Sequence, residues 1–139
     1  MPCGKCPACK ARRVSGWSFR LMQEDRVSLS SLFLTLTYDT STVPISQNGF
    51  MEIRKRDVQL FFKRLRFSLD NISSVPIKYY AVGEYGGKTM RPHYHIILFN
   101  YPPQLMKPLG LCKKGFPKFQ CDIIANAWQQ GGIDVGTVT

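Results

Sequence analysis

The helical pattern of residues 53–70, IRKRDVQLFFKRLRFSLD, constrains the fold more than any other feature of this chain. Its apolar side chains recur at the i, i+3, i+4, i+7 and i+11 spacing of one helical stripe, and they are Val58, Phe61, Phe62, Leu65 and Leu69. Basic side chains occupy the opposite face. Such a helix is stable only when its apolar stripe packs against another element, so the rest of the chain must supply a partner layer.

The segments around this helix predict that the partner layer is a β-sheet. Alternating or apolar β-rich stretches predict strands at residues 31–39, 76–84, 93–100 and 133–138. Residues 120–132 resemble a second, shorter helix with Asp122 as its N-cap and Gly131 as its stop, and the proline-containing segment before it is expected to be a loop. The resulting β-α-β-β-α-β order predicts a ferredoxin-like α+β fold, an antiparallel sheet with both helices on one face.

Two units are expected along the chain. Residues 1–30 form a Cys-rich, basic segment followed by a helix at about residues 10–26, and residues 31–139 form the core of the fold. The total of 139 residues suits one domain with a hydrophobic core, and no internal repeat or long linker divides it.

Three cysteines near the N-terminus, Cys3, Cys6 and Cys9, follow a C-x-x-C-x-x-C spacing. This spacing suits tetrahedral zinc when a fourth ligand comes from elsewhere, and Cys112 or Cys121 could supply it. An iron–sulfur cluster would need a fourth ligand too. The alternative is a reduced and flexible Cys-rich end that holds no metal.

The charge balance favours a polyanionic partner. The chain has 19 Lys and Arg residues against 9 Asp and Glu residues, which gives a net charge of +10. This excess indicates nucleic acid first, and a membrane surface less, because the positive charge does not form one polybasic run. A generally basic soluble surface is the alternative.

No apolar stretch approaches the roughly 18 residues of a membrane helix, and the N-terminus lacks a signal-peptide core, so a cytoplasmic protein is expected.

The only two histidines of the chain, His93 and His95, lie one residue apart in a predicted strand. Successive strand side chains point to opposite faces, so both imidazoles share one face and can approach one ion. If the segments 76–84 and 93–100 pair as a hairpin, Glu84 lies next to His93. Two imidazoles and a carboxylate suit Mn²⁺, Mg²⁺ or another divalent ion with open coordination positions. The alternative is a pair of histidines that are hydrogen-bonded in the core.

Three segments, FLTLTYD (33–39), VGEYG (82–86) and RPHYHIILF (91–99), resemble in this order the motifs of the HUH endonucleases, which initiate rolling-circle replication of small circular DNA. GEYGGKTMRPHYHIILF and the N-terminal CGKCPAC are similar to the initiators of small single-stranded DNA bacteriophages of the gokushovirus group, in the Microviridae. The resemblance covers most of the chain. It implies a replication initiator that acts on single-stranded origin DNA in the host bacterial cytoplasm, with host replication proteins as further partners and no membrane role.

The resemblance also implies the chemistry of the site. Glu84, His93 and His95 would hold Mg²⁺ or Mn²⁺, and the metal would polarise a phosphate while a tyrosine attacks it to form a 5′-phosphotyrosyl bond. The family's tyrosine lies in a Y-x-x-x-K type motif, and none of the six tyrosines here has a lysine four residues later. The nucleophile is therefore expected after Thr139. The alternative is that Tyr85 or Tyr38 serves, and Tyr85 is the stronger internal rival.

DNA contacts are expected around the metal face from Lys78, Lys88 and Arg91, with Tyr80 available to stack on a base. The basic face of the 53–70 helix is expected to be solvated, because a ferredoxin-like helix lies behind the sheet.

Three other functions stay open: a non-catalytic nucleic-acid-binding module on the same fold, another HUH enzyme such as a transposase or relaxase, and a cupin-like metal enzyme. In cupins the carboxylate usually follows the histidines, whereas here it precedes them.

Overall fold

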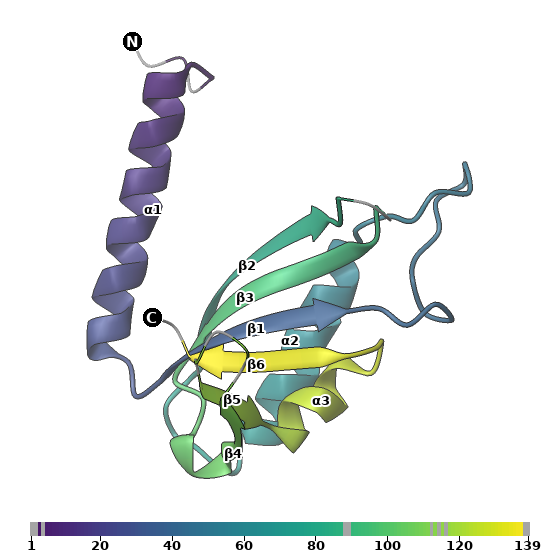
Figure 1. The fold of residues 1–139 in the computed structure, drawn as a ribbon. Coiled ribbons are helices and arrows are strands. Elements are labelled where there is room, and N and C mark those ends of the chain that lie inside the picture. The colour runs from purple at the N-terminus through teal and green to yellow at the C-terminus, as the bar shows by residue number, and fades with distance from the viewer. Residues whose placement is uncertain are drawn as a thin grey trace.

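In the part of the chain that the computed structural model describes, six strands form one antiparallel sheet (Figure 1). The described residues are Cys3, 5–87, 90–111, Lys113, Gly115 and 117–137. The strands are β1 Ser31–Thr37, β2 Lys78–Tyr85, β3 Pro92–Phe99, β4 Lys107–Leu111, β5 Pro117–Gln120 and β6 Ile133–Thr137. The helices are α1 Pro7–Val27, α2 Lys55–Leu69, the short 3₁₀ helix η1 Pro103–Leu105 and α3 Asp122–Trp128.

The strand order is β2-β3-β1-β6-β5-β4, and the paired strands run antiparallel. The β6-β1-β3-β2 portion is the ferredoxin-like arrangement, and α2 and α3 lie together on one face of it (Figure 1). The predicted fold class is thereby confirmed, and the βαββαβ order holds except for the β4–β5 pair inserted before α3. The opposite face, which carries Tyr80, Glu84, His93 and His95, is called the open face.

The apolar stripe of α2 packs on the covered face of the sheet, as its spacing predicts. All five of its members are buried: Val58, Phe61, Phe62, Leu65 and Leu69. They join alternate residues of the central strands, namely Leu32, Leu34, Leu36, Tyr94, Ile96 and Leu98. Trp128, at the end of α3, is fully buried and donates its indole N–H to the carbonyl oxygen of Thr37 at 2.7 Å. One hydrophobic core therefore joins both helices to β1 and β3.

The loop predicted before the second helix is wrong, because that segment contains the β4–β5 hairpin. β5 extends the sheet beside β6, with Lys118 opposite Gly136, and β4 pairs with β5 through a register shift between Pro108 and Gly110. Every residue of β4 is exposed, so its sequence has no apolar alternation that would indicate a strand. Proline and glycine weaken the signal further, although both are tolerated at a sheet edge.

The second predicted helix, 120–132, is too long at both ends. α3 begins at Asp122, so this residue lies in the first turn and Cys121 is the N-cap. The helix ends where Gln129 adopts a left-handed conformation with φ of 61°. A non-glycine residue in this conformation gives little sequence signal, which explains the missed end of the helix.

Gly131, predicted as the helix stop, instead allows a close approach between backbone segments. A Cβ atom at this position would collide with main-chain atoms of Thr37 and Asp39. The same corner is joined by two backbone hydrogen bonds, from the Thr37 amide to the Gly132 carbonyl at 3.0 Å and from the Asp39 amide to the Gln130 carbonyl at 2.8 Å. Glycine is therefore needed for the start of β6 to reach the end of β1.

α1 stands apart from the core, and Figure 1 shows it extending away from the sheet. None of its residues is buried. Its C-terminal half meets the start of β2, where Glu24 forms an ion pair with Lys78 at 3.1 Å and the ring of Trp17 lies 5.0 Å from that of Tyr80. Among the described residues, no helix is long and apolar enough to cross a membrane.

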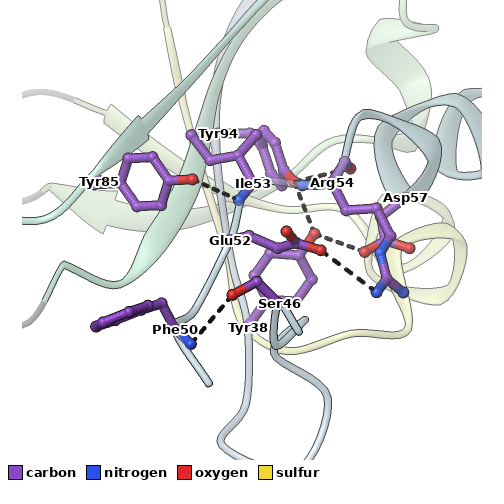
Figure 2. A network of polar contacts seen from close by, with 9 residues as sticks. All are labelled: Tyr38, Ser46, Phe50, Glu52, Ile53, Arg54, Asp57, Tyr85 and Tyr94. Atoms are coloured by element: carbon purple, nitrogen blue, oxygen red, sulfur yellow. Dashed lines mark hydrogen bonds and ion pairs between the residues drawn. The ribbon is translucent and has the colours of Figure 1, made fainter. Parts of the chain in front are cut away.

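A buried polar network ties the segment after β1 and the start of α2 to the sheet (Figure 2). The Tyr38 hydroxyl donates to Asp57 Oδ2 at 2.8 Å and lies 2.8 Å from the Tyr94 hydroxyl. The Tyr94 hydroxyl also bonds to the amide of Arg54 at 2.9 Å and to its carbonyl at 3.0 Å. Burial raises the pKa of both tyrosines, so both keep the protons that these bonds require.

Tyr38→Phe should lower the free energy of unfolding by about 1–3 kcal/mol, because it removes the hydroxyl that bonds to the buried Asp57 carboxylate. Tyr79→Phe is the matched control, since the Tyr79 ring stacks on Phe62 at 3.5 Å and the residue is 40% exposed. The control should change stability by less than about 0.5 kcal/mol. Urea unfolding followed by circular dichroism measures both variants, and equal losses would show that the network does not stabilise the fold.

Candidate metal centre on the open face

Glu84, His93 and His95 lie together on the open face of the sheet. β3 carries both histidines and lies between β1 and β2. The register places Glu84 directly opposite His93, and Thr37 on its other side. The hairpin that the sequence predicted therefore forms, and it brings the carboxylate to the imidazoles.

The three side chains converge on one point. Glu84 Oε1 lies 2.7 Å from His93 Nε2 and 2.9 Å from His95 Nε2. The two imidazole rings are 4.9 Å apart between centroids and are inclined at 85°, so they approach the carboxylate from different directions. The hydrogen bonds from His93 and His95 hold the pKa of Glu84 below its usual value, which keeps this residue an anionic ligand. One donor atom from each residue lies within 4.8 Å of the others, a spacing that one divalent ion can bridge.

Contacts behind the imidazoles orient them as metal ligands. His93 Nδ1 lies 3.3 Å from the carbonyl oxygen of Arg91, and His95 Nδ1 lies 3.4 Å from Thr35 Oγ1. A divalent ion would take the place of the Nε2 protons that bond to Glu84, and His93 would then donate its Nδ1–H to the Arg91 carbonyl, which is the usual arrangement around protein-bound ions. His95 also stacks on Phe33, with 5.5 Å between ring centroids. The residues present therefore fit a divalent ion that keeps open positions for another ligand.

Two of the predicted DNA contacts, Lys78 and Tyr80, lie on the open face and have partners on α1. The Lys78 ammonium pairs with Glu24, and the Tyr80 ring packs against Trp17. No sequence pattern indicates this association, because it joins residues that are far apart in the chain. It follows that α1 contributes side chains to the open face at the start of β2.

Arg91, a third predicted DNA contact, supports the end of β1. Its guanidinium donates to the carbonyl oxygen of Tyr38 at 2.9 Å and to Thr40 Oγ1 at 3.3 Å. The fourth, Lys88, lies outside the described residues. Of the four predicted contacts, two therefore lie on the open face near α1, and one is hydrogen-bonded to the loop after β1.

Tyrosine hydroxyls are held away from the three candidate ligands. Those of Tyr38 and Tyr94 belong to the buried network of Figure 2, and that of Tyr85 accepts the Ile53 amide at 3.0 Å on the covered side. Tyr79 stacks on α2, and Tyr101 is fully buried. Tyr80 shares the open face with Glu84 but stands four residues away along β2, about 13 Å.

The three N-terminal cysteines cluster at the start of α1, with their sulfur atoms within 4.8 Å of one another. Cys6 is the N-cap of the helix, and its sulfur accepts the Cys9 amide at 3.5 Å. The sulfur of Cys3 accepts the amides of Lys5 at 3.5 Å and of Cys6 at 3.3 Å. These bonds lower the pKa of the Cys3 thiol from 9.0 to about 7, so a metal-binding thiolate forms near neutral pH.

Cys121, which could have supplied a fourth ligand, has a different environment. It is buried in the core beside Tyr101, and burial raises the pKa of its thiol to about 11. It does not belong to the described cluster of Cys3, Cys6 and Cys9. Cys112, the other candidate, lies outside the described residues.

Alkylation by iodoacetamide should report the lowered pKa. Because the thiolate is the reactive form, the rate at Cys3 should rise with a midpoint near pH 7, about two pH units below that of an ordinary thiol. Cys121 should stay unmodified in the folded protein, since it is buried and its pKa is raised. Peptide mass spectrometry over pH 5–10 measures both, with Cys3→Ser as the control for assignment. A midpoint near pH 9 would contradict the hydrogen bonding at Cys3.

Comparison with known proteins finds one family over most of the chain. The family model described as replication-associated protein ORF2/G2P matches residues 31–139. The chain is 32% identical to replication-associated protein VP4 of Bdellovibrio phage phiMH2K, over 99% of its own length. It is 31% identical to replication-associated protein ORF2 of Spiroplasma virus 4 and 31% identical to replication-associated protein ORF4 of Chlamydia phage 1, in both cases over 100% of its length.

The chain spans less than half the length of these curated relatives. It covers 44% of the Bdellovibrio phage protein, 44% of the Spiroplasma virus protein and 35% of the Chlamydia phage protein. No solved structure matches the chain significantly.

Proposed function

The chain belongs to the replication-associated protein ORF2/G2P family, and from this premise we propose that it is the metal-binding part of an endonuclease that nicks single-stranded origin DNA to start rolling-circle replication. The relatives carry the name of replication-associated proteins of phages. The net charge of +10 suits a nucleic-acid substrate. The host bacterial cytoplasm as the place of action and host replication proteins as further partners belong to the same proposal.

The convergence of Glu84, His93 and His95 on one point of the open face carries this proposal. Their donor set suits Mn²⁺ or Mg²⁺. A divalent ion held there would act as a Lewis acid that polarises the scissile phosphate. The side chains leave one side of the site open to solvent, since Glu84 is 53% exposed at its side chain, which gives a DNA strand access.

In the proposed reaction, a tyrosine hydroxyl loses its proton and attacks the phosphorus atom. The bond from phosphorus to the 3′ oxygen breaks, the 3′ oxygen takes up a proton, and the 5′ phosphate stays on the tyrosine. We place this tyrosine outside the six of this chain, because none of their hydroxyls is held at the metal centre. The phosphodiester energy is kept in the covalent bond, which allows later rejoining of the strand.

His93→Ala and His95→Ala should each weaken Mn²⁺ binding by at least about tenfold, because each removes one of three protein ligands. Asp134→Asn is the matched control, since Asp134 lies beyond β1 and pairs with Lys118 at 3.1 Å. Titration followed by the electron paramagnetic resonance of free Mn²⁺ measures all variants.

Equal Mn²⁺ binding by the wild type and by the variant that lacks both histidines would rule out this metal centre. If Glu84→Gln alone bound as the wild type does, the histidines would remain ligands and Glu84 would not be one.

Residues 1–139 should bind single-stranded origin DNA without forming a covalent adduct in the presence of Mn²⁺. An in-line attack needs a hydroxyl beside the metal-bound phosphate, and Tyr85 points to the covered side of β2. Denaturing gels detect an adduct as a slowly migrating protein–DNA band, and native gels confirm binding in the same samples. An adduct that disappears in Tyr85→Phe would show that Tyr85 is the nucleophile.

A non-catalytic nucleic-acid-binding module is the second candidate function. The placement of the six tyrosines favours it, because such a module needs no nucleophile. It gives no reason, however, for two imidazoles and a carboxylate to meet at one point. A form of the protein that nicks DNA separates the two candidates. If removal of His93 and His95 abolishes its nicking but not its DNA binding, it is an endonuclease and not a binding module.

We further propose that Cys3, Cys6 and Cys9 bind zinc through their thiolates. The clustering of the sulfur atoms and the lowered pKa of Cys3 support this proposal. In the alkylation experiment above, one equivalent of Zn²⁺ should protect all three thiols together. Protection of none of them would indicate a Cys-rich end without a metal.

A further inference from the structure

α1 is a long helix that the core does not require. Its 21 residues span roughly 30 Å, and none of them is buried. The helix therefore makes little contribution to the hydrophobic core, and its presence beside the open face needs another explanation.

One stripe of α1 includes the residues that contact β2. The residues Lys10, Arg13, Trp17, Arg20 and Glu24 recur at three- and four-residue spacing, which places them on one side of the helix. Glu24 and Trp17 of this stripe contact Lys78 and Tyr80 of β2. The Arg20 guanidinium lies 5.3 Å from the centre of the Trp17 ring, on the same side. The C-terminal part of the stripe, at Trp17 and Glu24, contacts the open face. The N-terminal part carries the basic residues Lys10 and Arg13.

Aromatic side chains connect this stripe to the candidate metal centre. Phe33 stacks on His95 and is 40% exposed. Phe33 and Tyr80 both lie opposite Ile97 in the register, on the two sides of β3, and Tyr80 contacts Trp17, which is 42% exposed. Partly exposed rings therefore lie on both sides of Ile97, with Phe33 next to His95 and Tyr80 next to α1. These rings are called the aromatic row. Exposed rings beside basic side chains are the surface on which single-stranded nucleic acids bind, by base stacking and phosphate contact.

We infer that α1 is a binding arm for the single strand that flanks the scissile phosphate, with Trp17 and Phe33 stacking on bases and Lys10 and Arg20 contacting phosphates. This inference rests on the proposed function, which places that phosphate at Glu84, His93 and His95. The arm starts about 13 Å from Glu84 at Tyr80 and continues for about 10 Å from Trp17 to Lys10. The length of strand that the protein holds is therefore set by α1.

A membrane surface suits α1 less well. A helix that lies in a membrane interface gathers its apolar residues on one face. The exposed apolar residues of α1 are spread around the helix instead, and they include Val14, Phe19, Met22 and Val27. The single stripe that α1 does form is basic and aromatic, which matches a polyanion with stacking bases.

Tryptophan fluorescence gives a direct test with the intact protein. The chain has two tryptophans, and Trp128 is fully buried whereas Trp17 is 42% exposed. Titration with a single-stranded oligonucleotide of about 16 nucleotides, within the site sizes of single-strand-binding domains, should quench the Trp17 emission and protect it from acrylamide. Trp17→Phe should abolish this signal. Binding without any change in the Trp17 emission would overturn the inference.

Two charge-matched double variants test the phosphate contacts. Lys10→Gln with Arg20→Gln and Arg12→Gln with Arg26→Gln each lower the net charge from +10 to +8, but the second pair lies off the stripe and is exposed. The first pair should weaken oligonucleotide binding about tenfold and reduce the slope of log affinity against log salt by about 1.4, or about 0.7 per lost contact. The second pair should change both much less.

The outcomes separate this inference from the proposed function. If the wild type binds the oligonucleotide and the two double variants lose affinity equally, α1 acts only through its net charge and the inference fails while the proposed function stands. If the wild type binds no single-stranded DNA at all, both fail. Mn²⁺ binding at His93 and His95 should be the same in both double variants, which confirms that the fold and the metal centre are unchanged.

Discussion

The alternation of side chains along β3 is the constraint on which both faces of this protein depend. His93 and His95 point to the open face, while Tyr94 points to the covered face and joins the network with Tyr38 and Asp57. β3 is paired on both sides, so a slip of one residue would turn every one of these side chains to the wrong face. The contacts that hold the core together therefore also set the position of the candidate ligands.

Glu84 is less firmly held than the histidines, because β2 is the last strand at its edge of the described sheet. Two contacts outside the sheet compensate. The start of β2 is held by the ion pair of Lys78 with Glu24, and its end by the bond between the Tyr85 hydroxyl and the Ile53 amide (Figure 2). α1 and the segment before α2 thus contact the two ends of the strand that brings the carboxylate to the imidazoles.

Periodicity explains what could be predicted from this sequence and what could not. The stripe of α2 and the alternation around His93 are repeated patterns, so the helix, the hairpin and the neighbourhood of Glu84 followed from residue order alone. β4 has no buried residue and α3 ends at a left-handed Gln129, so neither has a periodic signal. The contact of Trp17 with Tyr80 joins residues far apart in the chain, and only the folded structure shows it.

Charge on the open face follows from the same arrangement. A phosphate approaching this face meets the Glu84 carboxylate, which would repel it, and Asp134, whose charge is offset by Lys118. A divalent ion held by Glu84 and two neutral imidazoles would change the local charge from −1 to +1, because bound cations are the largest local charges in such sites. A metal at this position would therefore do more than polarise a bond, because it would make Glu84 part of a cationic surface. The basic stripe of α1 attracts a strand in general, whereas only the metal centre can hold a phosphate at Glu84.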